Sequence, residues 1–321
     1  MKRRAFIRTA ALSAASLAGV RLWPQASSSN APALTKRPYK KGIELSIIGF
    51  PGLVLQGMEQ DHVNELVAQA VERGVNYFDV APAYDRGRCE MRLGPALEPH
   101  RKNVFLACKT QQRTAAGAKE EFERSLERLK TDHFDLYQLH SIYDVEKHVK
   151  AAFAKGGAMA YILEQQKAGR IRHLGFSAHS EAAALAALDL HAFDSFLLPI
   201  NFACYLKAGF GPKVLAKASE VGATPISIKS CVRQKHQGNS DAIQQKYRRC
   251  WYQPIDNRRE ADLAVRWALD LPIMACLPPM DERLFWQAVD VAQQYKSLNE
   301  TEQAEIRALA EGMDPLFPRE G

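Results

Sequence analysis

Short apolar runs alternate with amphipathic stretches along the chain after about residue 42. The runs have the length and the β-branched or aromatic content of buried strands, and they lie at 45–49, 75–79, 104–109, 134–140, 171–176, 193–200, 225–228 and 272–277. Each run is followed by a stretch whose apolar residues have helical spacing, and 301–311 predicts one helix more. Eight strand–helix units over about 240 residues predict an α/β fold, a single (β/α)₈ TIM barrel with an extra C-terminal helix.

A doubly wound parallel sheet is the alternative fold. It requires a glycine-rich first turn, and Gly209-Phe210-Gly211 follows no clear strand and lacks the third glycine. The stretch 230–258 interrupts the alternation and is rich in Lys, Arg, Gln and Asn, which predicts an inserted loop or short helices. Basic and aromatic residues mix at 246–252, and this pattern favours a substrate-covering loop or a partner face over a nucleic-acid patch.

Basic residues are concentrated at the amino terminus. The formal net charge is +7, but residues 1–41 hold nine Lys or Arg and no acid, whereas the other 280 residues hold 34 basic and 36 acidic groups. The body of the protein therefore has no general electrostatic attraction for nucleic acid.

Residues 1–26 have the composition of an export signal. A basic start precedes an apolar segment at 9–20, which is too short to span a bilayer comfortably. Arg3-Arg4 followed by Ala-Phe-Ile-Arg resembles the twin-arginine signal, which implies the twin-arginine export machinery as a partner and a periplasmic location in a bacterium. A basic disordered tail is the alternative, and an uncleaved leader would anchor the protein in the membrane. Residues 27–41 are expected to form a linker, and 42–321 the barrel domain.

Three successive predicted strands end in a residue that carries chemistry. Asp79, Lys109 and His140 end the strands at 75–79, 104–109 and 134–140, and Tyr84 follows the first of them by five residues. Because the carboxyl ends of parallel strands meet at one mouth of a barrel, these side chains are expected to converge. Each residue alone has an ordinary structural interpretation, such as a helix cap or a surface lysine. Four of them at neighbouring strand ends favour a catalytic site.

The same segments resemble the aldo-keto reductase family. Residues 74–84 (GVNYFDVAPAY) are similar to the signature around its catalytic Asp and Tyr, 105–110 to its lysine strand, 135–140 to its histidine strand and 169–177 to its fifth-strand motif. The resemblance covers roughly residues 42–310 and implies that Tyr84, Lys109, Asp79 and His140 form the catalytic tetrad.

The chemistry of these side chains suits carbonyl reduction, in which a hydride reaches carbon and a proton reaches oxygen. Tyr84 is expected to donate the proton, and Lys109 beside it is expected to lower the phenol pKa from its ordinary value of about 10. Asp79 would keep Lys109 charged, and His140 would orient the carbonyl oxygen by a hydrogen bond. The expected substrate is a small aldehyde or ketone.

By resemblance, the hydride comes from a nicotinamide cofactor, NADPH or else NADH. Ser177 and Asn201 match family positions that hydrogen-bond the carboxamide, while Ile228 stands where an aromatic ring usually stacks on the nicotinamide. Lys229 is expected either at a cofactor phosphate or in solvent. Arg283 is expected either at a 2′-phosphate or on the surface in the first turn of a helix.

No metal or iron–sulfur cluster is expected. The histidine spacings match no metal motif, and the six cysteines contain no CxxC pair, although the Gly-Phe-Ser-Ala-His turn at 175–179 resembles a family subgroup that carries a cluster domain. One functional alternative stays open: an exported barrel that retains the tetrad but acts as a binding or partner subunit, since free NAD(P)H is scarce outside the cytoplasm. The presence of all four tetrad residues argues against it.

Overall fold

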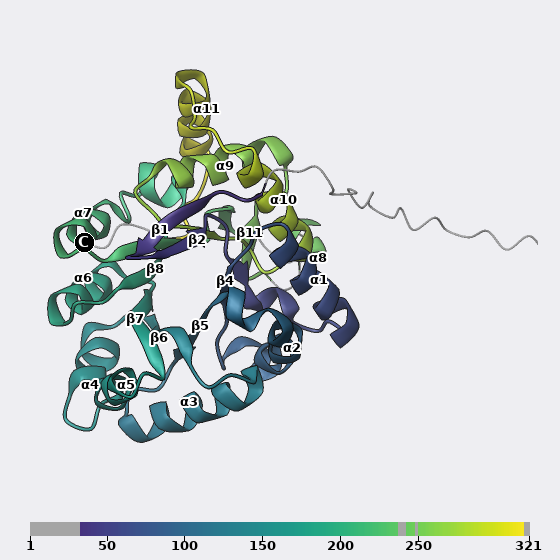
Figure 1. Cartoon of the computed structure of the whole chain (residues 1–321). Coiled ribbons are helices and arrows are strands. Elements are labelled where there is room, and N and C mark those ends of the chain that lie inside the picture. Colours follow the sequence, from purple (N-terminus) through teal and green to yellow (C-terminus); the bar gives the residue numbers. More distant parts are fainter. Residues whose placement is uncertain (1–32, 237–241, 248–249, 318–321) are drawn as a thin grey trace, which may run out of the picture. The chain divides into compact units, whose positions relative to one another are not determined.

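The computed structural model describes residues 33–236, 242–247 and 250–317. They belong to one compact unit, which contains an eight-stranded parallel sheet and two antiparallel strand pairs (Figure 1). The predicted export signal at 1–26 lies outside the described residues and stays a prediction. Among the described helices, none combines the length and apolar character that crossing a bilayer requires.

The eight parallel strands close into a barrel, which confirms the predicted fold. In spatial order they are β3 (Phe50–Pro51), β4 (Tyr77–Asp79), β5 (Phe105–Thr110), β6 (Phe134–Ile142), β7 (Ile171–Ala178), β8 (Ser195–Pro199), β9 (Thr224–Ile228) and β12 (Cys276–Leu277). The first and last strands meet through a parallel bridge between Ile48 and Cys276, with the Gly49 amide donating to the Cys276 carbonyl at 3.0 Å. All carboxyl ends therefore face one mouth of the barrel.

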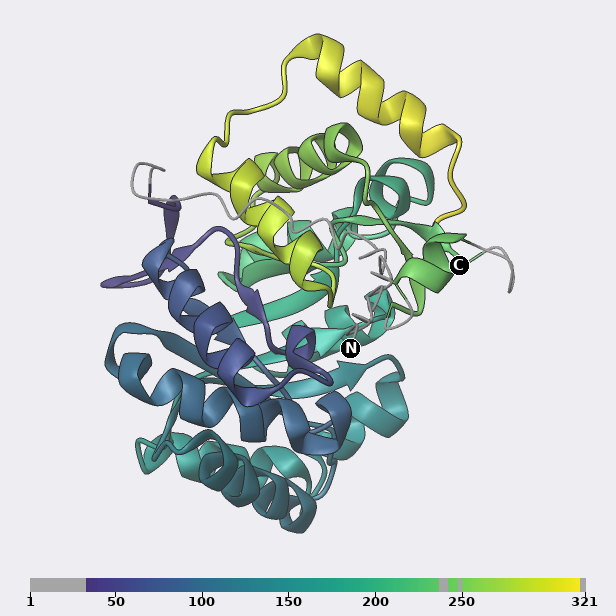
Figure 2. The same cartoon turned by 90° about the vertical axis from the view of Figure 1, so that its right-hand side faces the viewer.

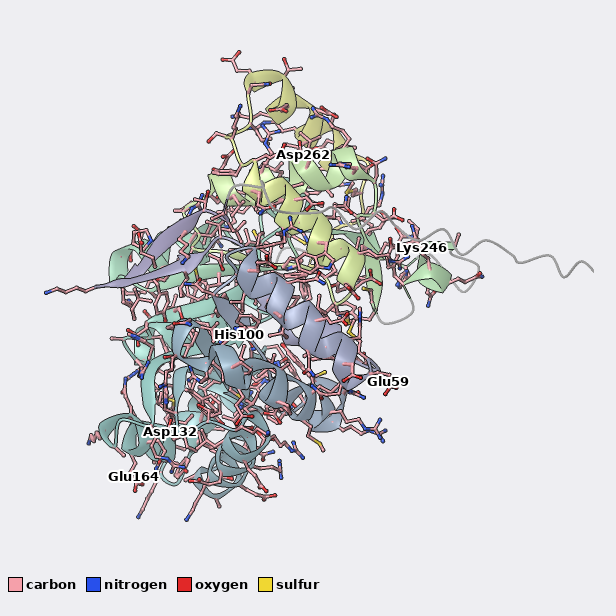
Figure 3. All side chains as sticks on the ribbon, turned by 45° about the vertical axis from the view of Figure 1, so that its right-hand side comes forward. Glu59, His100, Asp132, Glu164, Lys246 and Asp262 are labelled. Carbon is pink, nitrogen blue, oxygen red and sulfur yellow. The ribbon has the colours of Figure 1, made fainter. Side chains whose placement is uncertain are left out.

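Helices surround the barrel and cover its outer face (Figure 1). They are α1 (Gln60–Glu72), α2 (Arg88–Leu97), α3 (Ala115–Leu129), α4 (Ala151–Phe153), α5 (Ala158–Lys167), α6 (Glu181–Leu190), α7 (Pro212–Val221), α9 (Arg258–Asp270), α10 (Glu282–Gln293) and α11 (Glu300–Glu311). The additional C-terminal helix is present as predicted: α11 lies beyond α9 and α10 in Figure 2, and Arg266 of α9 pairs with Glu302 at 2.8 Å. Charged side chains such as Glu59, Asp132 and Glu164 point outward to solvent (Figure 3).

Alternation along the strands divides the core into two layers. Phe78, Leu106 and Tyr137 pack outward against the helices, whereas their neighbours Ala107 and Leu136 belong to a separate cluster inside the barrel. The inward positions of β4, β5 and β6 continue toward the mouth as Asp79, Lys109 and His140. The period-two pattern of the sequence therefore determines which side chains enter the barrel.

A hairpin closes the amino-terminal end of the barrel. It is formed by β1 (Lys36–Lys40) and β2 (Ile43–Ser46), and it places Tyr39 against Phe105, with ring centroids 5.2 Å apart. The Tyr39 hydroxyl also hydrogen-bonds Ser195 at 2.9 Å. Residues 36–40, within the expected linker at 27–41, thus form a strand instead.

One predicted strand boundary is wrong, and the insertion contains more structure than expected. The expected strand 45–49 is divided: residues 43–46 belong to the hairpin, 47–49 pair with Cys276, and the barrel strand β3 begins at Phe50. Gly49 permits this path because a Cβ there would lie 2.5 Å from the Tyr77 ring. The insertion at 230–258 contains α8 (Ala242–Lys246), as short helices were expected, but also an antiparallel pair, β10 (Val232–Lys235) and β11 (Tyr252–Pro254).

Candidate active site

The four predicted catalytic residues lie together at the carboxyl-terminal mouth of the barrel. Asp79 ends β4, Lys109 and His140 lie near the ends of β5 and β6, and Tyr84 begins a short turn after β4. The Lys109 ammonium forms an ion pair with Asp79, and both side chains are at least 98% buried. The same ammonium donates to the Val80 carbonyl at 3.2 Å.

Two further buried side chains hold the carboxylate of Asp79. Its second oxygen accepts from the Tyr77 hydroxyl at 3.2 Å and from the Gln138 amide at 3.3 Å. These two hydrogen bonds hold the carboxylate in place beside the Lys109 ammonium. Burial alone would lower the pKa of Lys109, but the charge of Asp79 raises it above its ordinary value. Lys109 therefore remains a cation inside the barrel.

Tyr84 lies between the lysine and the histidine. The Lys109 ammonium is 5.3 Å from the centre of its ring, and the ring meets His140 edge-on with centroids 5.7 Å apart. Burial raises the pKa of Tyr84 to about 12, and this outweighs the opposite effect of Lys109. The expectation of a lowered phenol pKa is thus wrong in its net direction, although Lys109 does act as expected. Tyr84 is a neutral phenol at physiological pH.

His140 is a neutral imidazole. Burial and then the charge of Lys109 hold its pKa well below the ordinary value. Its backbone carbonyl accepts from Arg113 at 2.7 Å, which fixes the end of β6, and its Nδ1 has no partner among the described residues. The imidazole therefore keeps hydrogen-bonding capacity for a ligand.

Ser177 and Asn201, the positions expected at the carboxamide, are both buried at the ends of β7 and β8. The Ser177 hydroxyl oxygen accepts from the Ser141 amide at 2.8 Å, and the Asn201 side-chain oxygen accepts from the Cys204 amide at 2.9 Å. The Ser177 hydroxyl can still donate in this arrangement, whereas the Asn201 side chain also hydrogen-bonds the Cys204 side chain. The donor set fits the carboxamide of a nicotinamide.

Lys229 and Arg283, the positions expected at phosphates, have different surroundings. Lys229 follows β9 and contacts His179, with Nζ and Nε2 2.9 Å apart. Arg283 lies in the first turn of α10, where its Nε donates to Asp281 at 3.1 Å and its guanidinium carbon lies 4.9 Å from the Tyr247 ring centre. Its side chain is 53% exposed, so a cofactor phosphate would compete with Asp281 for it.

The sequence interpretation assigned no catalytic role to Tyr77, Gln138 or His179. Tyr77 and Gln138 share the inward faces of their strands with Asp79 and His140, so alternation alone could have brought them into the site. His179 was considered only as a metal ligand. Within the described residues, no group of three or more His, Cys, Asp or Glu is arranged to hold a metal ion.

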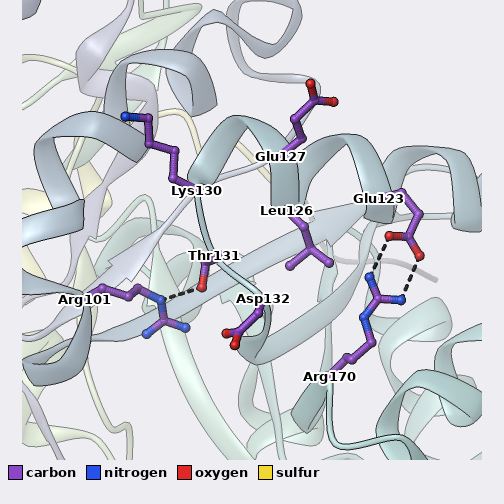
Figure 4. A pocket seen from close by; sticks show the side chains of 8 residues that line it. All are labelled: Arg101, Glu123, Leu126, Glu127, Lys130, Thr131, Asp132 and Arg170. Carbon is purple, nitrogen blue, oxygen red and sulfur yellow. Dashed lines mark hydrogen bonds and ion pairs between the residues drawn. The ribbon is translucent and has the colours of Figure 1, made fainter.

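A separate hollow of about 770 Å³ lies at the opposite end of the barrel. It is lined by Arg101, Glu123, Leu126, Glu127, Lys130, Thr131, Asp132 and Arg170 (Figure 4). Thr131 and Asp132 precede β6 and Arg170 precedes β7, so the hollow faces the strand starts. Arg170 is already bound to Glu123 through two hydrogen bonds of 2.8 and 2.6 Å. This hollow contains none of the tetrad residues.

Parts of this chain are similar in sequence to known proteins. Residues 48–199 match the model of the aldo/keto reductase family. Two curated relatives from Bacillus subtilis (strain 168) are the uncharacterized oxidoreductase YqkF, 37% identical over 110 residues, and the aldo-keto reductase YhdN, 31% identical over 156 residues. These matches cover 30% and 42% of this chain and 36% and 44% of the relatives' own lengths.

The fold agrees with a solved structure over a longer range. An aldo-keto reductase from Bacillus halodurans, in its holo form, superposes with a TM-score of 0.68 at 20% identity, covering 89% of this chain and all of that one. The family model and the curated relatives thus show similarity to aldo/keto reductases over part of this chain, and the solved structure shows the same fold.

Proposed function

We propose that the protein is an oxidoreductase that reduces an aldehyde or ketone with hydride from NADPH or NADH. The observation that carries this proposal is the buried Lys109–Asp79 ion pair beside the neutral side chains of Tyr84 and His140 at the barrel mouth. A binding protein has no need for a desolvated ion pair next to a phenol. Such a pair does stabilise negative charge that develops during a reaction.

Tyr84 is proposed as the proton donor. With a pKa of about 12, the phenol holds its proton at neutral pH and releases it only when charge grows on the carbonyl oxygen. Lys109 then stabilises the phenolate that forms. Asp79, held by Tyr77 and Gln138, keeps Lys109 charged before and after the transfer.

His140 is proposed to orient the substrate. Because its pKa lies well below the ordinary value, His140 is a neutral imidazole at physiological pH. The one N–H of a neutral imidazole can donate a hydrogen bond to the carbonyl oxygen but is too weak an acid to give up its proton. His140 would thus position the substrate, and Tyr84 would supply the proton. Tyr84 is therefore the single acid proposed for this site.

The cofactor is proposed to bind across the ends of β7 and β8. A bound nicotinamide would supply the hydride, which no protein side chain can provide. Ser177 and Asn201 would hold its carboxamide by hydrogen bonds. Ile228 offers a smaller stacking surface than an aromatic ring would. Lys229 and Arg283 as phosphate contacts stay predictions.

The proposed acid is tested by the substitution Tyr84→Phe. We expect kcat for carbonyl reduction to fall by about 1,000-fold or more, because the ring keeps its packing but has no proton to donate. Tyr295→Phe is the matched control, since this tyrosine follows α10 and donates to Asp270, the last residue of α9. Steady-state oxidation of NADPH with a panel of aldehydes measures both. Equal rates for the parent and Tyr84→Phe would exclude Tyr84 as the acid.

The alternative of a non-catalytic barrel is tested by cofactor binding. Titration of the purified protein with NADPH and with NADH, followed by nicotinamide fluorescence, should show saturable binding of at least one. Absence of binding by both would favour the non-catalytic alternative. The comparison of the two dissociation constants also shows which dinucleotide is used.

A further inference from the structure

Two basic side chains meet at the barrel mouth outside the tetrad. His179 directly follows β7 and Lys229 directly follows β9, so the two reach toward each other across the end of β8. Their nitrogens Nε2 and Nζ are 2.9 Å apart, a hydrogen-bond distance. One of the two must therefore donate and the other accept. Two groups that can each become cations are unfavourable neighbours unless an anion joins them.

No carboxylate among the described residues forms an ion pair with His179 or Lys229. The acidic group that does influence Lys229 is the weakly acidic Cys204 thiol. The ammonium instead faces two aromatic rings, at 5.8 Å from the centre of Trp251 and 5.7 Å from that of Phe317. The Nδ1 atom of His179 is buried and has no partner in the described part of the chain. The polar groups of this pair are thus left for a ligand.

The backbone at Lys229 is unusual. Its φ of +61° lies in the left-handed region, which a residue other than glycine adopts at an energetic cost. The turn is fixed by the Val232 amide, which donates to the Lys229 carbonyl at 3.2 Å. The fold therefore maintains a strained conformation that directs this lysine to His179.

The His179–Lys229 pair influences the electrostatics of the tetrad residue His140. After burial and Lys109, both His179 and Lys229 contribute to lowering the pKa of His140, so both lie within electrostatic reach of the group proposed to orient the carbonyl. Trp251, which is 56% exposed, and Phe317 form aromatic sides next to the pair. A ligand group bound by this pair would lie at the same mouth of the barrel as the tetrad.

We propose that His179 and Lys229 bind an oxyanion, a carboxylate or phosphate group, on the carbonyl substrate. The inference rests on the proposed reductase function and specifies its substrate class: acidic aldehydes or ketones whose anionic group lies a few bonds from the carbonyl. The oxyanion would accept from the Lys229 ammonium and from His179. The neighbouring rings would cover the apolar part of such a compound.

The test compares charged and neutral substrates of matched size. The intact chain is assayed with 4-oxobutanoate against butanal, and with glyceraldehyde 3-phosphate against glyceraldehyde. We expect the parent to have a higher kcat/KM for the charged compound than for the neutral one in at least one of these two pairs. Preference for 4-oxobutanoate would indicate a carboxylate site, and preference for glyceraldehyde 3-phosphate a phosphate site. In Lys229→Met this ratio should fall by about 30-fold or more, because a charge-assisted hydrogen bond is lost. Lys167→Met, an exposed lysine in the last turn of α5, should leave the ratio unchanged.

A binding measurement separates failure of this inference from failure of the proposed function. Calorimetry with succinate and with inorganic phosphate should show binding of one of them by the parent and its loss in Lys229→Met. Reduction of neutral aldehydes with no charge preference and no anion binding would overturn the inference and leave the reductase function intact. An unchanged ratio in Lys229→Met, together with weakened NADPH binding, would assign the pair to a cofactor phosphate and also overturn it. Anion binding without any reductase activity would support the pair and contradict the proposed function.

Discussion

The barrel mouth contains two lysines in opposite electrostatic settings. Lys109 lies beside Asp79, and its pKa is raised, whereas burial lowers the pKa of Lys229, which has no carboxylate partner among the described residues, to about 7. Both follow from one rule: a desolvated ammonium stays charged only if an anion compensates it. For Lys109 the protein supplies the anion itself. For Lys229 we propose that a ligand supplies the anion. Lys109 is thus suited to catalysis, and Lys229 to binding an anionic group of the substrate.

Removing the anion beside Lys109 should have the largest effect. In Asp79→Asn the buried ammonium keeps neutral acceptors such as the Val80 carbonyl but loses its anion, so we expect kcat to fall by about 1,000-fold and the free energy of unfolding to fall by about 3–5 kcal/mol. Urea unfolding and steady-state kinetics measure the two losses. The double variant Asp79→Asn/Lys109→Met should regain stability but not activity. A fully active Asp79→Asn enzyme would contradict the assigned role of the pair.

The converse change gives Lys229 an anion of its own. In His179→Glu an ion pair replaces the present contact, so the lysine should remain charged at neutral pH but be occupied by the new carboxylate. We expect the kcat/KM ratio for 4-oxobutanoate over butanal to fall by at least about tenfold, as the glutamate competes with and repels the substrate's charge. His179→Gln, which adds no charge, serves as the control. A larger ratio in His179→Glu than in the parent would show that Lys229 does not bind the anion.

A smaller effect should appear as a pH dependence. With a pKa of about 7, Lys229 is charged below this pH, so preference for the anionic substrate should decline as pH rises through 7. The neighbouring histidines do not titrate in this range, because the pKa of His179 is about 3 and that of His140 is well below its ordinary value. In the unfolded chain the lysine keeps its proton to about pH 10, so above pH 7 its contribution to the free energy of unfolding increases with pH. Lys229→Met should show neither the decline in preference for the anionic substrate nor this pH-dependent gain in the free energy of unfolding.

The surroundings of Lys109 could be predicted from the sequence, whereas those of Lys229 could not. Asp79, Lys109 and His140 end consecutive strands that are neighbours in the barrel, so alternation and chain order suffice to bring them together. His179 and Lys229 follow β7 and β9, which are separated by β8, and no sequence pattern indicates that their side chains meet. The net shift of Tyr84 also escaped prediction, because it depends on the extent of burial.

The same reasoning explains the errors in the fold. Barrel strands with continuous apolar runs were recognised, whereas the hairpin strand at 36–40 buries only Tyr39 and β10 is mostly polar. These strands are stabilised by pairing with a partner and not by apolar alternation. A period-two pattern is absent where only one or two side chains are buried.

The comparison between the two lysines is tested most directly by their own titrations. NMR of the protein labelled with ¹³C-lysine, with signals assigned by Lys109→Met and Lys229→Met, follows each ammonium as pH rises. The account predicts that Lys229 loses its proton near pH 7 while Lys109 remains charged beyond its ordinary pKa. Titration of both lysines together above pH 10, or loss of the Lys109 proton first, would contradict it.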